Sequence, residues 1–193
     1  MAAKHGMLQE IEGCIEQFAG KAAAQRIMEG SEQITEKTDK RETAQWMKQA
    51  VKKLDAEIDE KTRVRIMQNC GYNCAKKNHR IIERAVARRK KYGSIDEFLE
   101  AEQQKPMKGT KLTRAGDTLY HYYTPQAFTK PIRCYCGLFR ELPTEDTVSI
   151  TYCSCSKGFV EKYWEAVLER PVEVEILQSA LSGATECKFA IHL

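Results

Sequence analysis

The spacing of apolar residues changes once along this chain, and that change limits the folds open to it. Up to about residue 105 apolar side chains recur every three or four positions, as in Leu8, Ile11 and Ile15, which is the spacing of amphipathic helices. Farther along, residues 172–176 alternate apolar with acidic side chains, as in a strand with one wet face. We therefore predict an α+β fold, with a helical N-terminal part followed by an antiparallel sheet with one main helix.

Capping residues suggest where the helices begin and end. Asp39 followed by Glu42 is typical of a helix start, and Ser94 followed by Glu97 is typical of another. Gly71 is predicted to end a helix, because glycine adopts the left-handed C′ conformation without steric cost. The helices are expected near residues 8–18, 39–54, 59–71, 73–93 and 94–99.

A polar segment, residues 103–117, separates the two patterns and holds one proline and two glycines. We therefore divide the chain into a helical N-terminal region, residues 1–105, and an α+β domain, residues 108–193. Strands are expected at residues 118–123, 131–136, 147–155, 172–176 and 188–193, with the main helix after Ser156.

The charge and hydropathy of the chain narrow its partners. A net charge of +4 is too small to indicate a nucleic-acid partner. Residues 76–91 are strongly basic, which a solvated helix face explains, with an acidic partner or a phosphate backbone as the alternative. The sequence has no apolar run of membrane-spanning length and no apolar stretch of a secretory signal near Met1. We expect a cytoplasmic protein that does not engage a membrane.

Eight cysteines are expected to be reduced in that compartment, and four of them form pairs two residues apart. On a strand such side chains share one face but lie about 6.6 Å apart, whereas two sulfurs on one zinc must approach within about 4 Å. Three interpretations stay open: metal ligation by a subset, buried thiols acting as small apolar side chains, and redox or catalytic chemistry. The candidate ligands of zinc or another thiolate-bound metal are Cys70, Cys74, Cys134, Cys136, Cys153, Cys155 and Cys187.

Cys74 is the candidate catalytic residue. If Gly71 ends one helix and Asn73 caps the next, Cys74 lies in a first helical turn with Lys76 and Lys77 nearby. A helix N-terminus and adjacent cations stabilise a thiolate, so we expect a lowered pKa for this thiol. The alternative is that Cys74 packs between two helices.

A group of aromatic side chains and one histidine supplies candidate ligand-binding residues. An aromatic-walled cavity and ordinary core packing predict the same side chains. The sequence contains neither a glycine-rich phosphate loop nor a nucleophile elbow. The candidates are Tyr120, His121, Tyr123, Tyr152 and Trp164.

Cys153, Gly158, Arg170-Pro171, Gly183 and Cys187 follow one another at an ungapped spacing. That layout resembles the C-terminal part of 4-vinyl reductase-like domains, including the ligand-sensing domains of phenol-responsive transcription activators. The resemblance is good from Cys153 onward and looser over residues 108–193. It implies that the chain binds or senses a small, largely apolar molecule.

The resemblance also implies a metal site, from which this chain departs. In the phenol sensors the same layout holds zinc through three cysteines and a glutamate. Cys153 and Cys187 fall on two of these positions, but Ile176 and Ser179 fall on the other two and neither is a zinc ligand. We therefore expect the two cysteines to face one site without a complete zinc centre from these four positions.

The cysteine motifs at residues 70–74, 134–137 and 153–156 give the whole chain a second resemblance. It is similar to uncharacterised bacterial cysteine-rich proteins, which are similar in turn to L-2-amino-thiazoline-4-carboxylate hydrolase-like proteins. This resemblance implies an alternative function, a thiol- or metal-dependent hydrolase acting on a small substrate. The partners that we expect are a small-molecule ligand and, in a homodimer, a second copy of the chain.

Overall fold

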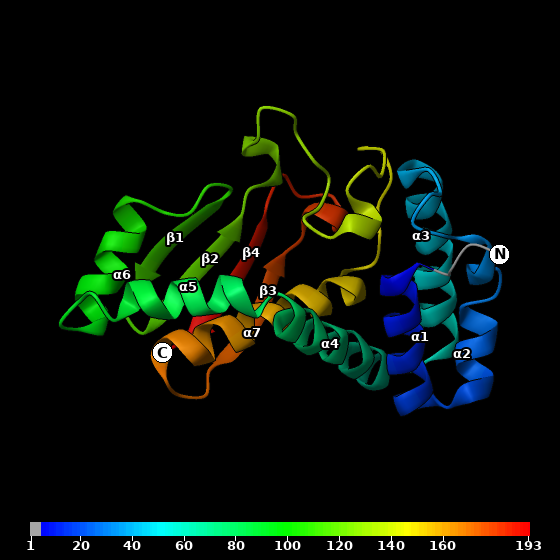
Figure 1. Ribbon diagram of the computed structural model, residues 1–193, viewed down its shortest axis with the longest axis horizontal. Helices are drawn as coiled ribbons and strands as arrows, with labels where there is room; N and C mark the ends of the chain where they lie inside the picture. Colours follow the sequence, from blue (N-terminus) through cyan, green and yellow to red (C-terminus); the bar gives the residue numbers. More distant parts are fainter. Residues whose placement is uncertain (1–4) are drawn as a thin grey trace.

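The computed structural model describes residues 5–193 and confirms the predicted α+β fold (Figure 1). The helices are α1 (Gly6–Ala19), α2 (Lys21–Ile27), α3 (Lys40–Glu57), α4 (Glu60–Lys77), α5 (His79–Arg89), α6 (Ile95–Gln104) and α7 (Ser154–Leu168). The strands are β1 (Thr110–Ala115), β2 (Thr118–Tyr123), β3 (Glu173–Gln178) and β4 (Cys187–His192). The short 3-10 turns are η1 (Ser31–Gln33), η2 (Pro125–Ala127), η3 (Gly137–Phe139), η4 (Ile150–Cys153) and η5 (Ala180–Ser182).

The elements form an elongated molecule (Figure 1). Helices α1, α2 and α3 lie at one end, the sheet and α6 lie at the other, and α4 and α7 lie between them. In the described part of the chain no helix is long and apolar enough to cross a membrane.

The four strands form one antiparallel sheet in the order β1-β2-β4-β3. Side chains alternate along β2, so that Leu119 and His121 are buried beneath the sheet while Tyr120 and Tyr122 lie on its outer face. Lysine side chains from β1 and β4 cover the outer tyrosines through cation–π contacts. The inner face packs on α7, where the Trp164 indole donates to His121 Nδ1 at 3.1 Å.

Two hydrophobic cores hold the molecule together. The first lies among α1–α4 and takes in Leu138, Phe139 and Leu181 from later in the chain. The second lies between the sheet and α7 and takes in Phe98 and Leu99 from α6. Each core therefore draws residues from both sides of the connection at residues 105–109. The division into 1–105 and 108–193 stays a prediction.

Two of the predicted strands are wrong. Residues 131–136 form no strand, and residues 147–155 form an extended piece, the turn η4 and the first residues of α7. The Ser149 side chain accepts a hydrogen bond from Thr151 N at 3.2 Å, which starts a helical turn where strand pairing was expected. Strand β1 lies in the segment that was expected to be a linker. The sequence does not predict this strand, because only Leu112 of its six residues is buried and the alternation of apolar residues is therefore weak.

The helix boundary predicted at Gly71 is also wrong. Helix α4 continues through Gly71 to Lys77, and Asn78 separates it from helix α5. Gly71 serves a packing contact, since a β-carbon on it would lie 2.0 Å from the Cys155 carbonyl oxygen. Cys74 therefore lies in the last turns of a helix rather than in a first turn.

Candidate functional site

Helices α4 and α7 cross in close backbone contact, and this crossing builds the candidate site. A β-carbon on Gly158 would lie 2.3 Å from the Gln68 carbonyl oxygen, so both helices need glycine at the contact. Gln68 and Tyr72 of α4 also donate to the carboxylate of Glu161 in α7, at 2.6 and 2.8 Å. The crossing brings the cysteine-bearing face of α4 against the start of α7.

The eight cysteines gather around this crossing, and we call them the thiol cluster. All eight are free, and each interacts electrostatically or by a hydrogen bond with at least one other cysteine of the group. Cys155 lies at its centre, close to thiols from α4 and from the segment 124–149. The members are Cys14, Cys70, Cys74, Cys134, Cys136, Cys153, Cys155 and Cys187.

Most of these thiols are neutral at physiological pH. Burial raises the pKa of Cys155 well above its ordinary value, and the neighbouring thiols raise it further. Burial also raises the pKa of Cys153, to about 12. The same cause raises the pKa of Cys74, so the lowered value expected for a helix N-terminus is wrong. The catalytic role of Cys74 stays a prediction, since no observation tests it directly.

Cys14 behaves differently and was not predicted as a site residue. Its sulfur accepts hydrogen bonds from the Asn69 and Asn73 amides at 3.5 and 3.6 Å, and from the Cys70 thiol. These donors hold the pKa of Cys14 well below its ordinary value, while the shared hydrogen bond raises that of Cys70. In the sequence Cys14 falls on the apolar stripe of α1, and its partners lie on another helix, so spacing gives no signal.

Aromatic side chains line the sheet side of the cluster. The rings of Tyr123 and Phe128 both pack edge-on against Tyr135, with centroids 5.1 and 5.8 Å away. The Tyr152 hydroxyl lies 3.1 Å from the Cys136 sulfur. Tyr123 interacts electrostatically with the thiols of both Cys74 and Cys187, which places it between helix and sheet.

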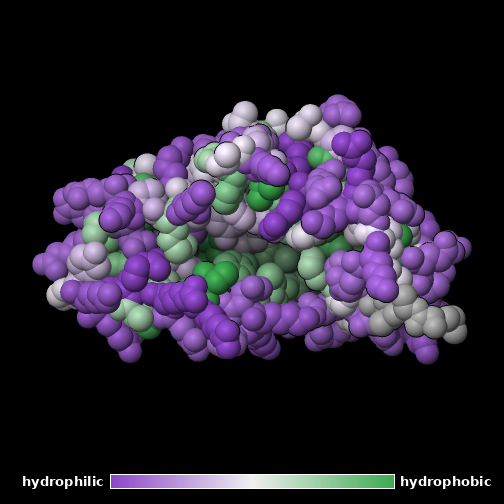
Figure 2. Space-filling view, turned by 45° about the horizontal axis from the view of Figure 1, so that its top comes forward, coloured by the Kyte–Doolittle hydropathy of each residue, from purple (hydrophilic) through white to green (hydrophobic). Residues whose placement is uncertain are grey.

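A hollow opens on the same stretch of the molecule. Figure 2 shows it about midway along the long axis, with apolar atoms on its floor and polar side chains around its rim. We call it the central hollow. The thiol cluster lies around the crossing of α4 and α7, in the middle stretch of the molecule (Figure 1). Four of its cysteines are half-buried residues, namely Cys74, Cys134, Cys136 and Cys155, and the other four are buried.

The structure divides the predicted ligand-binding residues into three groups. Tyr123 and Tyr152 contact the thiol cluster. His121 and Trp164 bond to each other beneath the sheet, beside a cavity of about 10 Å³, roughly the space of one water molecule. Tyr120 lies on the outer face of the sheet, stacked under Lys188.

The predicted pairing of Cys153 with Cys187 has a structural counterpart. The Cys153 sulfur lies 2.8 Å from the Ser179 hydroxyl, and the Cys187 sulfur accepts a hydrogen bond from Ala180 N at 3.4 Å. Both thiols therefore contact consecutive residues, and Cys187 adds electrostatically to the burial that raises the pKa of Cys153. The side chain of Ile176 is partly buried and packs on both hydrophobic cores.

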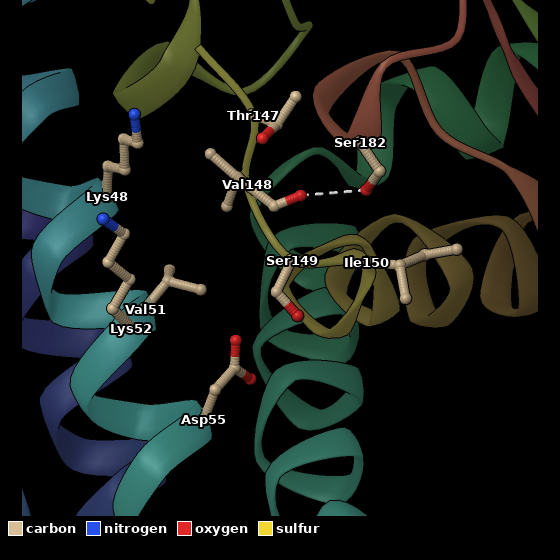
Figure 3. Close-up of a pocket in the computed structure, with 9 residues that line it drawn as sticks. All are labelled: Lys48, Val51, Lys52, Asp55, Thr147, Val148, Ser149, Ile150 and Ser182. Carbon is tan, nitrogen blue, oxygen red and sulfur yellow. Dashed lines mark hydrogen bonds between the residues drawn. The ribbon is translucent and has the colours of Figure 1, made fainter.

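A second, separate cleft lies between α3 and the segment 147–150 (Figure 3). It encloses about 430 Å³ and mixes charged, hydroxyl and apolar side chains. Asp55 projects toward it, paired with Arg63 at 3.2 Å, and the Ser182 hydroxyl at its edge donates to the Val148 carbonyl at 2.9 Å. Its size lies in the range of small-molecule sites, but it contains no thiol or aromatic ring.

Two solved structures have a similar fold. An Fe(II) unliganded H-NOX protein from K. algicida matches with a TM-score of 0.52 and 14% identity, covering 98% of this chain and 95% of that chain. A mutant H-NOX domain from Shewanella oneidensis in the Fe(II)CO ligation state matches with a TM-score of 0.51 and 10% identity, covering 98% of each chain. The fold is thus of the H-NOX kind. The chain itself belongs to a family of unknown function, DUF6144, whose profile matches residues 3–193.

No curated protein matches the sequence significantly. The 4-vinyl reductase-like and hydrolase-like resemblances stay predictions, since the matches above support only the general class of fold.

Iron is named for both H-NOX structures, and zinc or another thiolate-bound metal was one of the three interpretations left open for the cysteines of this chain. Within residues 5–193 no three or more histidine, cysteine, aspartate or glutamate side chains are grouped so as to hold a metal ion. The side chains as arranged do not fit a directly ligated ion, and a thiolate-bound metal stays a prediction for elemental analysis.

Proposed function

We propose that this protein binds a small, largely apolar molecule in the central hollow, against the half-buried cysteines and the rings of Tyr123, Phe128 and Tyr135, which we call the aromatic wall. The observation that carries the proposal is the convergence of half-buried cysteines from three separate segments, α4, residues 134–136 and α7. Thiols and aromatic rings offer polarizable, weakly polar surface, which favours an apolar ligand over a strongly hydrated one. The likeness to H-NOX structures supports the general idea of a small-molecule site in this fold.

The raised thiol pKa values favour binding over nucleophilic chemistry. A cysteine nucleophile reacts as the thiolate and needs a base or a cation beside it. Cys74 instead receives one hydrogen bond, from the Asn78 amide at 3.4 Å, and burial dominates its pKa. The hydrolase alternative therefore has no supporting observation at this residue and stays a prediction from resemblance.

Fluorescence of 1-aminoanthracene, a small neutral aromatic probe, tests the proposal. We expect saturable enhancement with the wild-type chain and at least a tenfold weaker affinity for Cys74→Phe, whose larger side chain fills the space beside the half-buried cysteines. Ile150→Phe is the matched control, because Ile150 borders the separate α3 cleft and its substitution should leave the affinity unchanged.

Alkylation with iodoacetamide gives an independent readout on the wild-type chain. Saturating probe should slow the labelling of Cys74, Cys134, Cys136 and Cys155 together. Absence of saturable fluorescence would rule out the proposed function. Loss of binding in Ile150→Phe, with these thiols unprotected, would move the ligand site to the α3 cleft.

A further inference from the structure

The α3 cleft, which lies between α3 and the segment 147–150, has a charged wall and a facing wall that carries hydroxyl groups (Figure 3). On α3, Lys48, Lys52 and Asp55 follow one another at helical spacing, so they share one face of the helix. The facing wall is held by a hydrogen bond from Val148 N to the backbone of η5 at 2.8 Å. Both walls are therefore fixed parts of the fold, as is typical of ligand sites.

The charged side chains of the cleft do not balance one another. Lys48 is paired with Asp146, and Asp55 is paired with Arg63 at 3.2 Å. Lys52 also lines the cleft, but none of the ion pairs in the described part of the chain includes it. The lining side chains and their ion-pair partners therefore carry one positive charge in excess, which favours a ligand with one negative charge.

The carboxylate of Asp55 has a cation beside it but lacks a hydrogen-bond donor. Its buried Oδ1 accepts no hydrogen bond from the residues that the structure describes. The donors of Arg63 are used elsewhere, since Nε donates to the Thr151 hydroxyl at 3.3 Å and Nη1 donates to the Ile58 carbonyl at 3.0 Å. A carboxylate without a donor is costly when it is withdrawn from water. The Asp55 side chain is 25% exposed and projects toward the cleft, where a ligand hydroxyl can donate to it (Figure 3).

Apolar side chains complete the lining. Val51 and Val148 are buried against the cleft, while Ile150 at its edge is 46% exposed. An apolar group of a ligand would remove part of this isoleucine from water, which is favourable. Lys52 and Asp55 lie three residues apart on α3, with β-carbons about 5–6 Å apart, so one small molecule can reach both while it lies against these side chains.

We propose that the α3 cleft binds a small hydroxy acid with an aliphatic body, whose carboxylate pairs with Lys52 and whose hydroxyl donates to Asp55. One carboxylate balances the excess positive charge, and a hydroxyl supplies the donor without placing a second cation beside Arg63. The aliphatic body covers Ile150, and a cleft of about 430 Å³ accommodates a molecule of this class. The site is separate from the central hollow and does not depend on the proposed function.

Three ligands with the same carbon skeleton test this on the wild-type chain. α-Hydroxyisocaproate carries both groups, isocaproate lacks the hydroxyl, and leucine has an ammonium group in place of the hydroxyl. Amide chemical shifts in an NMR titration report both the affinity and the site. We expect α-hydroxyisocaproate to shift residues 147–150 saturably and to bind at least tenfold more tightly than the other two. Equal affinity of isocaproate, tighter binding of leucine, or no saturable shift at these residues would overturn the inference.

A competition experiment separates this site from the central hollow. α-Hydroxyisocaproate should leave the fluorescence of bound 1-aminoanthracene unchanged, because the two ligands occupy different places. Displacement of the fluorescent probe would put both ligands in one site and overturn the inference.

Lys52→Met tests the carboxylate end of the site. Lys52 is exposed, so this variant should keep the melting temperature of the wild type while it loses at least tenfold in affinity for α-hydroxyisocaproate. Lys53→Met is the matched control, because Lys53 is the next residue but pairs with Glu29 and does not line the cleft. Its affinity should equal that of the wild type. An unchanged affinity in Lys52→Met, or equal losses in the two variants, would overturn the inference.

Discussion

His121 is a buried polar side chain whose hydrogen bonding is satisfied within the core. Its Nδ1 accepts the indole N–H of Trp164, and the rings of Tyr123, Tyr163 and Trp164 surround it. Burial lowers the pKa of His121 to about 4, so the ring is neutral near pH 7 with its proton on Nε2. His121, a candidate ligand-binding residue, is therefore a neutral side chain held within the core, and its binding role stays a prediction.

The lowered pKa of His121 predicts a dependence of stability on pH. The unfolded chain binds a proton at this ring near pH 6.5 and the folded chain near pH 4, so stability falls as pH falls between these values. The loss at this one residue should amount to about 3 kcal/mol. Urea denaturation at several pH values measures it. His121→Gln retains an acceptor for Trp164 and should flatten the profile by that amount; parallel profiles would contradict the assignment.

Cys14 should be the most acidic thiol of the chain. Its alkylation rate, followed by peptide mass spectrometry, should rise with a midpoint well below the free-thiol value of about 8.5. Asn73→Ala removes one donor to the sulfur and should move the midpoint upward. Asn78→Ala is the matched control, because Asn78 donates to Cys74 and leaves Cys14 untouched. A midpoint insensitive to Asn73 would show that the amides do not stabilise the thiolate.

At the scale of elements, the glycines at the crossing of α4 and α7 predict a sharp contrast. Gly71→Ala would place a methyl group against the Cys155 carbonyl and should cost at least about 3 kcal/mol of folding free energy. Gly13→Ala is the control, since Gly13 also lies within a helix but has open space around it. That change should stabilise the fold by up to about 1 kcal/mol. Chemical denaturation measures both, and similar effects would refute the packing role.

The elements that the sequence predicts well are those whose signals are local. Asp39 caps α3 through its side chain, Ser94 caps α6, and Val174 faces inward from β3, all as expected. The failures have non-local causes. Gly71 looks like a helix end when only its neighbours in the sequence are considered. The contact that requires glycine there is with the backbone of Cys155, which lies 84 positions away along the chain.

The thiol cluster follows the same rule. The cysteines themselves can be named from the sequence. Their convergence between the helical part and the sheet was expected only if they shared a bound metal. The strand geometry that was predicted for Cys134 with Cys136 and Cys153 with Cys155 is wrong, yet helical turns and loops bring the same thiols together. Cys14 could not have been found as a site residue, because its significance depends on which groups surround it after folding.

At the scale of the whole molecule, both hydrophobic cores join the two halves of the chain. A fragment of residues 108–193 would expose Leu138, Phe139 and Leu181 where α1–α4 now cover them. We expect this fragment to show no cooperative unfolding transition, whereas the full chain shows one. Circular dichroism in a urea series decides it. A cooperative transition of the fragment would instead support two independent domains.

The predicted homodimer is a separate question, and sedimentation velocity of the full chain tests it.

The crossing of α4 and α7 has a mechanical consequence for the whole molecule. Most packed helices are separated by a layer of side chains, which lets one slide over the other when rotamers change. At Gly71 and Gly158 the two backbones touch, and no such layer exists. The two helices should therefore behave as one rigid body, and amide hydrogens of both helices near the contact should exchange with solvent at similar, slow rates. Helix α4 also packs on α1. A ligand that changed the tilt of α7 beneath the sheet would therefore be expected to move α4 as well, and with it the end of the molecule formed by α1, α2 and α3.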